Sequence, residues 1–444
     1  MNAPCSPDPL FDPGRGLIFA DLEALMSVSF VEKPSRDEFA KLVIEAADRA
    51  GIAGIKYDQK DFTLWYKCSG GTAGLFLGNF YAEYCQADSA AGTDLVMGRW
   101  LYGMQGVKSS PAKLASFEEA RPKLLAVVKN RVTLAEPTLG WQLDRSKPGF
   151  KIRFEPISRW FGRCAVLDFP RHLTFVTEWD LKTWCASFEE VFSIGLAKLR
   201  KSTKPDFRFE NGFFAGKWSD SYANSRILLP QLFAGLRLSG NPVVCLPNTQ
   251  TLLVTGSQDH TGIRRMLMRS AEIARNEPRP DSPAPLILKH GRIEDFAVPS
   301  DSPHYDAVEF ARKDAEYLCY QRQKESLDVL YAKHEKDIFV ASSHLATPNE
   351  GEDGECFSYA VWSKGVHALL PKLDKIAFND PGAPKSHRLL AMARWEDVAA
   401  LLGDMLQDTH MFPERFFVSE FPSDQQLETL RRMQTDSRLQ PALK

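Results

Sequence analysis

The segment from Trp218 to Arg265 constrains the fold most, because it combines two short apolar runs with a helical run. Residues 243–246 and 251–255 predict two strands joined by Pro247-Asn248-Thr249-Gln250, and residues 258–275 predict a helix. Residues 220–236, which precede the strands, predict a helix that is kinked or broken at Pro230.

Short strands and helices of this kind alternate along the whole chain, which predicts an α+β fold with mixed or antiparallel sheets and packed helices. Ser-x-x-Glu boxes begin three of the expected helices, at Ser35, Ser116 and Ser187. The pattern over residues 252–266 is echoed over residues 416–433, which indicates repeated β-hairpin–helix units.

The length of 444 residues allows about three domains of roughly 150 residues each. Proline-rich residues 276–285 predict a linker, and a second break is expected at residues 299–303 before a long helix over residues 305–334. We therefore expect a disordered lead-in over residues 1–16 and α+β domains over residues 17–145, 146–298 and 299–444.

The composition is that of a soluble globular protein, with 44% hydrophobic and 25% charged residues. A formal charge of −2 predicts no nucleic-acid partner, and no apolar window is long enough to predict a membrane span. The eight cysteines include no Cys-x-x-Cys pair, which favours reduced, buried thiols and a cytoplasmic location.

A glycine-rich run, Ser69-Gly70-Gly71-Thr72-Ala73-Gly74, lies between an expected strand over residues 61–66 and an expected helix from residue 75. Backbone amides in such a turn can hold a phosphate. The run lacks the Gly-Lys-Ser/Thr ending of a P-loop, so a plain turn is the favoured interpretation.

Four segments resemble the bacterial family DUF1444, also called UPF0354, which has no established biochemical activity. They are residues 36–39, 77–84, 220–230 and 242–257, and together they extend the resemblance over residues 35–275. The last third of the chain is an addition to the family pattern. Members of the family carry an Arg-Asp pair in the loop before the second strand, where this chain has Pro247-Asn248-Thr249-Gln250.

Candidate ligand-binding residues are the polar groups and glycines that cluster around the expected hairpin and helices. Arg226 has no capping role inside its expected helix, and the Gly256-Ser257 turn lies at a helix start. Capping or turn formation is the competing explanation for several others. The six candidates are Arg226, Asp220, Asn248, Gly256, Ser257 and Arg265.

Other polar groups favour structural roles. Asp259 and His260 suit a helix start better than a triad with Ser257, and four arginines between residues 264 and 275 are typical of a solvated helix face. The acidic residues between 350 and 355 lack the calcium-loop pattern. No metal site and no cofactor is predicted.

Three functional hypotheses remain open, and the third is an inactive scaffold whose C-terminal domain mediates self-association. The first is a cytosolic module that binds an unknown small ligand or protein without catalysis. The alternative is an enzyme acting on a small phosphorylated or nucleotide-like ligand near Arg226 and Gly256-Ser257, with Arg226 or Arg265 holding the anion. That alternative requires Arg226 to point into a cleft. The sequence does not decide the oligomeric state.

Overall fold

The computed structural model describes residues 33–87, 93, 96–97, 116–143, 151–169, 173–218, 220–347 and 356–439, apart from residues 53, 61 and 69–70. Helices and antiparallel or mixed sheets alternate over these residues, so the predicted α+β class is confirmed. The lead-in predicted over residues 1–16 lies outside the described residues.

The first unit packs helix α1 (Arg36–Arg49) on an antiparallel three-stranded sheet, and helix α2 (Gly78–Gln86) follows it. Its strands are β1 (Lys56–Asp58), β2 (Thr63–Cys68) and β3 (Gly71–Phe76). The capping box expected at Ser35 is present, because the Glu38 amide donates to the Ser35 hydroxyl at 3.3 Å and the Ser35 amide donates to the Glu38 carboxylate at 2.7 Å.

The glycine-rich run is a strand rather than a turn from Gly71 onward, and it pairs with β2 in a hairpin. Gly74 lies opposite Trp65, and a Cβ atom added to Gly74 would lie 2.9 Å from the Trp65 ring. The glycine therefore leaves room for the indole, and its amide belongs to a β-ladder rather than to a phosphate-binding turn. The helix expected from residue 75 begins at Gly78.

A second sheet is organised around strand β6, which pairs antiparallel with β4 on one side and with β5 and β7 on the other. The strands are β4 (Leu124–Asn130), β5 (Phe154–Pro156), β6 (Phe161–Asp168) and β7 (Leu173–Phe175). The helices of this region are α4 (Phe117–Ala120), η3 (Arg121–Lys123), α5 (Arg131–Leu143), α6 (Glu178–Trp184) and α7 (Phe188–Ser202). Because β4 pairs with β6, this sheet crosses the domain boundary predicted between residues 145 and 146.

The third sheet has six antiparallel strands in the order β13-β12-β10-β11-β9-β8. They are β8 (Phe207–Glu210), β9 (Phe213–Gly216), β10 (Pro242–Asn248), β11 (Leu253–Gly256), β12 (Pro280–Lys289) and β13 (Arg292–Asp295). Helix α8 (His260–Asn276) packs its apolar side on one face of this sheet. The predicted hairpin over residues 243–255 and the helix that follows it are confirmed.

The helix predicted over residues 220–236 is wrong. This segment forms two short 3-10 helices, η4 (Asn224–Leu228) and η5 (Pro230–Leu232). The Ser225 hydroxyl accepts the Val128 amide at 3.0 Å, and the Asn224 amide group donates to the Asp281 carboxylate at 2.7 Å. These side chains bond to neighbouring strands, and such bonds compete with a regular helix.

The linker predicted over residues 276–285 is also wrong, because strand β12 begins at Pro280. Strand β13 pairs only with residues 286–289, so the prolines lie where β12 has β10 as its strand partner. Two of the proline carbonyls accept hydrogen bonds from groups outside β10. The Pro285 carbonyl accepts the Phe296 amide at 2.9 Å, and the Pro280 carbonyl accepts the Arg322 guanidinium at 3.2 Å. A proline lacks the N–H that a strand on the other side of β12 would need as a donor. Among the described residues, no strand pairs with that side of β12 at the prolines, so the missing N–H groups cost no strand hydrogen bond there.

Two four-stranded sheets follow the long helix α9 (Tyr305–Lys333). One is ordered β14-β17-β21-β20 and the other β15-β16-β18-β19, and each contains one parallel pair. The strands are β14 (Phe339–Val340), β15 (His344–Ala346), β16 (Phe357–Ser363), β17 (Ala368–Pro371), β18 (Lys375–Asn379), β19 (Leu389–Arg394), β20 (Gln407–Asp408) and β21 (Arg415–Val418). The helices are η6 (Lys385–His387), α10 (Trp395–Leu402), η7 (Gly403–Met405) and α11 (Asp424–Leu439).

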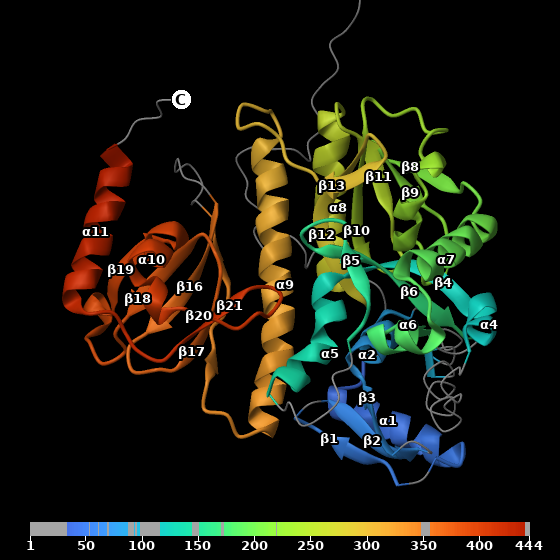
Figure 1. Cartoon of the computed structure of the whole chain (residues 1–444), viewed down its shortest axis with the longest axis horizontal. Helices are drawn as coiled ribbons and strands as arrows, with labels where there is room; N and C mark the ends of the chain where they lie inside the picture. Colours follow the sequence, from blue (N-terminus) through green and yellow to red (C-terminus); the bar gives the residue numbers. More distant parts are fainter. Residues whose placement is uncertain are drawn as a thin grey trace, which may run out of the picture.

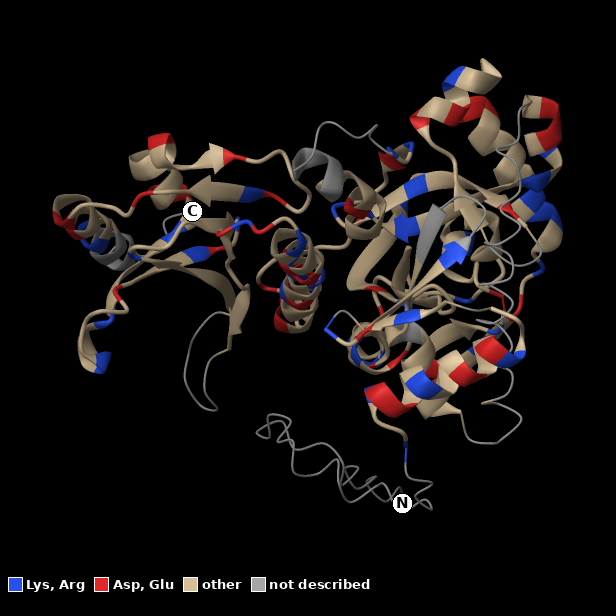
Figure 2. Ribbon diagram, turned by 90° about the horizontal axis from the view of Figure 1, so that it is seen from below, with Lys and Arg blue, Asp and Glu red and all other residues tan. Residues whose placement is uncertain are grey.

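Helix α9 stands between the last two sheets and the rest of the protein (Figure 1). It packs against β12, α8 and α5 on one side and against β14, β15 and β16 on the other. The view from below shows the same arrangement, with basic and acidic residues interspersed along the helices (Figure 2). The C-terminal domain predicted from residue 299 therefore begins with a helix that packs against both neighbouring regions.

The two segments expected to be repeated units share an order of elements. The hairpin of β10 and β11 precedes α8, and the hairpin of β20 and β21 precedes α11. Their sheets differ, because the first is wholly antiparallel and the second contains a parallel pair.

A first prediction concerns the contact between α7 and β4. Gly195 lies so close to this strand that an added Cβ atom would be 2.6 Å from the Ala126 nitrogen. We expect Gly195→Ala to lower the free energy of unfolding by about 1–3 kcal/mol, because backbone must move to admit the methyl group. Denaturant titration followed by circular dichroism measures this change.

Gly403→Ala is the matched control. No atom lies within 4 Å of the Cβ position at Gly403, and its φ of −54° suits alanine. This substitution is expected to leave stability unchanged or to raise it by about 0.4–1 kcal/mol. Equal stability of the two variants would contradict the close approach of α7 to β4.

Candidate functional site

Arg226 and Asp220 are bonded to each other. The two terminal nitrogens of Arg226 donate to the two carboxylate oxygens of Asp220 at 2.7 and 2.6 Å. The Arg226 side chain is 2% exposed, and its guanidinium lies 4.6 Å from the centre of the Trp218 ring. The arginine that the phosphate hypothesis requires in a cleft is therefore bound to a carboxylate of the same chain.

Partial burial alone would raise the pKa of Asp220. The hydrogen bonds and positive charge of Arg226, together with the Tyr222 amide, outweigh this effect and hold the pKa below its ordinary value. Asp220 is thus ionised at neutral pH as the partner of Arg226.

Asn248 closes the turn between β10 and β11. Its side-chain oxygen accepts the Gln250 amide at 3.0 Å, and its amide group donates to the Glu277 carboxylate at 3.0 Å. The residue is 2% exposed. Turn formation accounts for the bond to Gln250, and the bond to Glu277 joins the turn to the end of α8.

The Gly256-Ser257 turn is closed against the segment that precedes β10. Ser257 donates its amide to the Asn241 carbonyl at 2.8 Å and accepts the Asn241 amide on its hydroxyl at 3.0 Å. A Cβ atom added to Gly256 would lie 2.2 Å from the Ser239 carbonyl oxygen. The turn permits a close approach of backbone rather than presenting amides to a ligand.

The arginines of α8 bond to protein acceptors. Arg265 donates to the Asn211 carbonyl at 3.4 Å, and Arg264 donates to the Pro303 carbonyl at 3.3 Å. Arg269 contacts Glu277, and Arg275 pairs with the buried Asp314. Of the six predicted site residues, Asp220 and Arg226 bond to each other, and Gly256 and Ser257 are neighbours in the chain. The bonds described above do not join these two pairs, or Asn248 and Arg265, into one site.

The start of α8 carries a capping residue and a histidine pair. Asp259 accepts the Gly262 amide at 2.8 Å, as expected of an N-cap. The Nδ1 atoms of His260 and His304 are 2.9 Å apart, and the Phe296 ring is nearly parallel to the His304 ring. Burial, followed by the nearby His260 and Arg264, lowers the pKa of His304.

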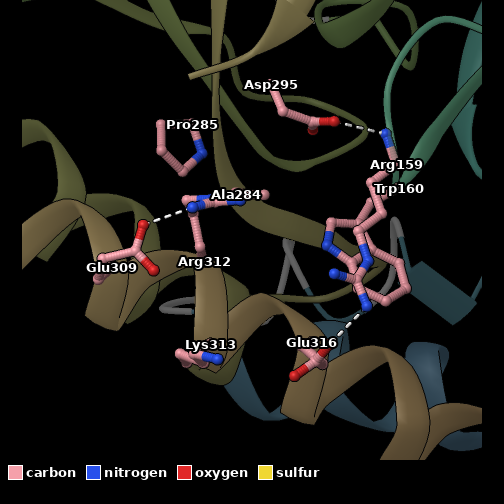
Figure 3. Close-up of a pocket in the computed structure, with 9 residues that line it drawn as sticks. All are labelled: Arg159, Trp160, Ala284, Pro285, Asp295, Glu309, Arg312, Lys313 and Glu316. Carbon is pink, nitrogen blue, oxygen red and sulfur yellow. Dashed lines mark hydrogen bonds and ion pairs between the residues drawn. The ribbon is translucent and has the colours of Figure 1, made fainter. Parts of the chain in front are cut away.

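A pocket lies where α9 meets β12, β13 and the turn between β5 and β6 (Figure 3). Its volume is about 70 Å³. A single water needs roughly 10–15 Å³ in the same kind of measure, so the pocket has room for a few waters or a small polar molecule. Six of its lining residues are charged: Arg159, Arg312, Lys313, Asp295, Glu309 and Glu316.

These charges belong to a network that reaches the C-terminal sheets. Arg159 donates through its backbone amide to Asp295 at 2.8 Å and through its guanidinium to Glu316 at 2.5 Å. Glu316 also accepts the Ser358 hydroxyl at 2.8 Å. Ser358 donates its amide to Asp374 at 2.7 Å. The network therefore joins the β5–β6 turn, α9 and the start of β16.

Glu316 is the most buried carboxylate of this network, with a side chain 8% exposed. Burial raises its pKa, and Asp374 adds to this rise, whereas Arg159, Ser358 and Lys313 oppose it. Lys313 pairs with Asp374. The pocket thus contains both signs of charge at short range in a half-buried setting.

The pocket residues are not among the candidates predicted from the sequence. Glu309, Arg312, Lys313 and Glu316 follow the i, i+3, i+4, i+7 spacing of one helix face, which was a usable signal. Charged faces of helices are usually solvated, so the pattern alone favours solvent. The lining contributed by the β5–β6 turn, Arg159 and Trp160, lies more than a hundred residues from α9 in sequence, so no local pattern links the two.

No three His, Cys, Asp or Glu side chains gather as a metal-binding group within the described ranges. The acidic residues considered between 350 and 355 lie outside these ranges. Among the helices that the structure describes, none combines the length and apolar composition needed to cross a membrane.

No family model, curated protein or solved structure matches the chain. The resemblance to the DUF1444 family over residues 35–275 therefore stays a prediction.

A second prediction concerns the Asp220–Arg226 pair. We expect Asp220→Asn to destabilise the protein at pH 7, because a buried guanidinium loses its charged acceptor. The loss is limited to about 1–3 kcal/mol because Asp220 itself is partly exposed and solvent screens its charge. The pKa of Asp220 is lowered by folding, so this contribution is complete above its unfolded pKa of about 3.9 and is lost as pH falls through the folded pKa.

Urea unfolding of the wild type and the variant between pH 7 and pH 3 measures this difference. Asp404→Asn is the control, because Asp404 is exposed in η7. It should change stability by less than about 0.5 kcal/mol at every pH. A stability difference for Asp220→Asn that does not shrink in acid would contradict the assigned pairing.

Proposed function

We propose that the chain is a binding protein without catalytic activity of its own, and that its ligand occupies the pocket between α9, β12, β13 and the β5–β6 turn. The observation that supports this proposal is the small number of hydrogen bonds that the Arg312 guanidinium makes. Within the described residues its guanidinium has one hydrogen-bonding partner, Glu309, although it carries five N–H donors. Spare donors facing a small polar cavity are suited to an anionic group of a ligand.

The lining charges define the kind of ligand that we propose. Three basic and three acidic residues surround the pocket, and its volume is far below that of a nucleotide. A small zwitterion the size of an amino acid matches this lining, with its carboxylate at Arg312 and its ammonium group at Glu309 or Asp295. A ligand with both charges adds no net charge to a half-buried site.

Binding is favoured over the enzyme hypothesis for a geometric reason. Arg226 is held by Asp220, and Ser257 is held by Asn241, so neither is directed at a shared ligand position. A phosphate clamp and an anchoring turn are the two parts that the enzyme hypothesis requires.

A cytoplasmic location and membership of the DUF1444 family remain parts of this proposal. The six cysteines assigned as free thiols support a reducing compartment: Cys85, Cys164, Cys185, Cys245, Cys319 and Cys356. The family assignment rests on the four sequence segments described above.

A third prediction tests the pocket with free amino acids as probes, together with acetate and methylammonium as singly charged controls. A ligand at 100 times its Kd stabilises the native state by about 2.7 kcal/mol, so it raises the melting temperature measurably. We expect a shift with at least one amino acid and not with the singly charged compounds. Arg312→Ala should abolish the shift.

Arg292→Ala is the matched control, because Arg292 is exposed on β13 but does not line the pocket. It should retain the wild-type shift. Absence of a shift with every amino acid, or a shift that survives Arg312→Ala, would sink the proposed site. Turnover of a bound amino acid by the wild type would overturn the claim that the protein lacks catalysis.

A further inference from the structure

Strand β8 ends the six-stranded sheet, and its outer edge presents an apolar side chain to solvent. Phe209, in the middle of the strand, is 63% exposed. Among the described residues, no strand or side chain bonds to the backbone of Phe207 or Phe209 from outside the β8–β9 hairpin. Free extended edges with exposed apolar groups are templates for strand pairing.

The hairpin geometry shows which backbone groups face this edge. Asn211 and Gly212, with φ values of 46° and 96°, form a two-residue turn, so Glu210 and Phe213 flank it as a hydrogen-bonded pair. Hydrogen-bonded pairs alternate along an antiparallel ladder. The Asp206 carbonyl accepts the Lys217 amide at 2.9 Å, which agrees with this phase. The N–H and C=O groups of Phe207 and Phe209 therefore point outward.

We propose that β8 pairs with β8 of a second copy of this chain, antiparallel about a two-fold axis at Phe209. Phe209 then exchanges both backbone hydrogen bonds with Phe209 of the second copy. In this register Arg208 lies opposite Glu210 of the other copy, and Glu210 lies opposite its Arg208. The edge is thus complementary in charge to itself, as an isologous contact requires.

The surroundings of β8 are compatible with this pairing. Arg208 and Glu210 pair with each other on the α8 side of the sheet, and Phe209 contacts Phe214 on the opposite side. Helix α8 packs on β9, β10, β11 and β12, so it covers strands inward from the edge. The two phenylalanines of the dimer lie side by side on one face, where aromatic cross-strand pairs are favourable.

The register makes a charge-swap test possible. Sedimentation velocity of the full-length protein over a range of concentrations should show a monomer–dimer equilibrium. Arg208→Glu places like charges opposite each other and should raise the dimer Kd by roughly threefold or more. The double variant Arg208→Glu/Glu210→Arg restores opposite charges and should return to within about twofold of the wild-type Kd.

Phe209→Lys should raise the dimer Kd by roughly tenfold or more, because it removes the central apolar pair. Leu389→Lys is the matched control, because Leu389 is 61% exposed on β19, the edge strand of another sheet. It should dimerise like the wild type. Circular dichroism of each variant confirms that the monomer is folded.

A cysteine variant provides the positional test. Residues in a hydrogen-bonded antiparallel pair have Cα atoms about 5.5 Å apart, within the range of a disulfide. In a Cys185→Ser background, Phe209→Cys should therefore form a disulfide-linked dimer under mild oxidation, and Leu389→Cys should not. On a denaturing gel, reduction converts this cross-linked dimer to the monomer band.

Three results would overturn the proposal. They are a wild-type protein that stays monomeric at all concentrations, a dimer whose Kd is unchanged by Phe209→Lys, and a Phe209→Cys variant that does not cross-link faster than Leu389→Cys. Because the amino-acid pocket lies at the β13 side of the sheet, its binding assay reports independently of this edge.

Discussion

Arg415 is the residue on which the arrangement of the C-terminal half depends. It is fully buried in β21, and burial lowers its pKa to about 10. Its guanidinium donates to the Gln323 side chain at 2.6 Å and to the carbonyls of Ala341, Leu369 and Tyr320 at 2.8, 3.0 and 3.3 Å. A buried cation is tolerated only when such acceptors replace water. The helix and strands that supply them must therefore stay in register.

Because two of these acceptors belong to α9, Arg415 fixes the helix to the sheet of β14, β17, β21 and β20. The opposite side of α9 packs on β12 and α8, and one of its charged faces lines the pocket. Lys313 and Glu316 extend this connection, since one pairs with Asp374 and the other accepts Ser358. The geometry of the proposed ligand site is thus set by contacts on both sides of a single helix.

Local signals predicted the elements whose stability is local. The Ser35 box, the hairpin over residues 243–255 and the helix after Asp259 form as expected, because caps, strand periodicity and turn residues act over a few positions. Residues 220–236 depart from the helical pattern because Asn224 and Ser225 bond to distant strands. The class of the fold was accessible in this way, but the order of strands within its sheets was not.

The candidate residues within residues 218–265 belong to a segment rich in polar groups, and composition does not distinguish a ligand contact from an internal one. Arg226 illustrates this, since an arginine without a capping role is equally suited to a neighbouring carboxylate. The pocket was missed for a related reason. Arg159 and Glu316 are 157 positions apart, so only the folded chain brings their charges together.

The prolines of β12 have a consequence for the unfolded and partly unfolded chain. Pro280, Pro283 and Pro285 remove three N–H groups from a strand whose residues are mostly buried. Stacked cross-β assemblies require every residue to donate to the chain above or below it. If the sheet opens, β12 becomes exposed, and a normally buried strand is a common starting point for fibril growth. The missing N–H groups make β12 a poor starting point. The same prolines that resemble a linker in the sequence thus make this segment unsuited to cross-β stacking.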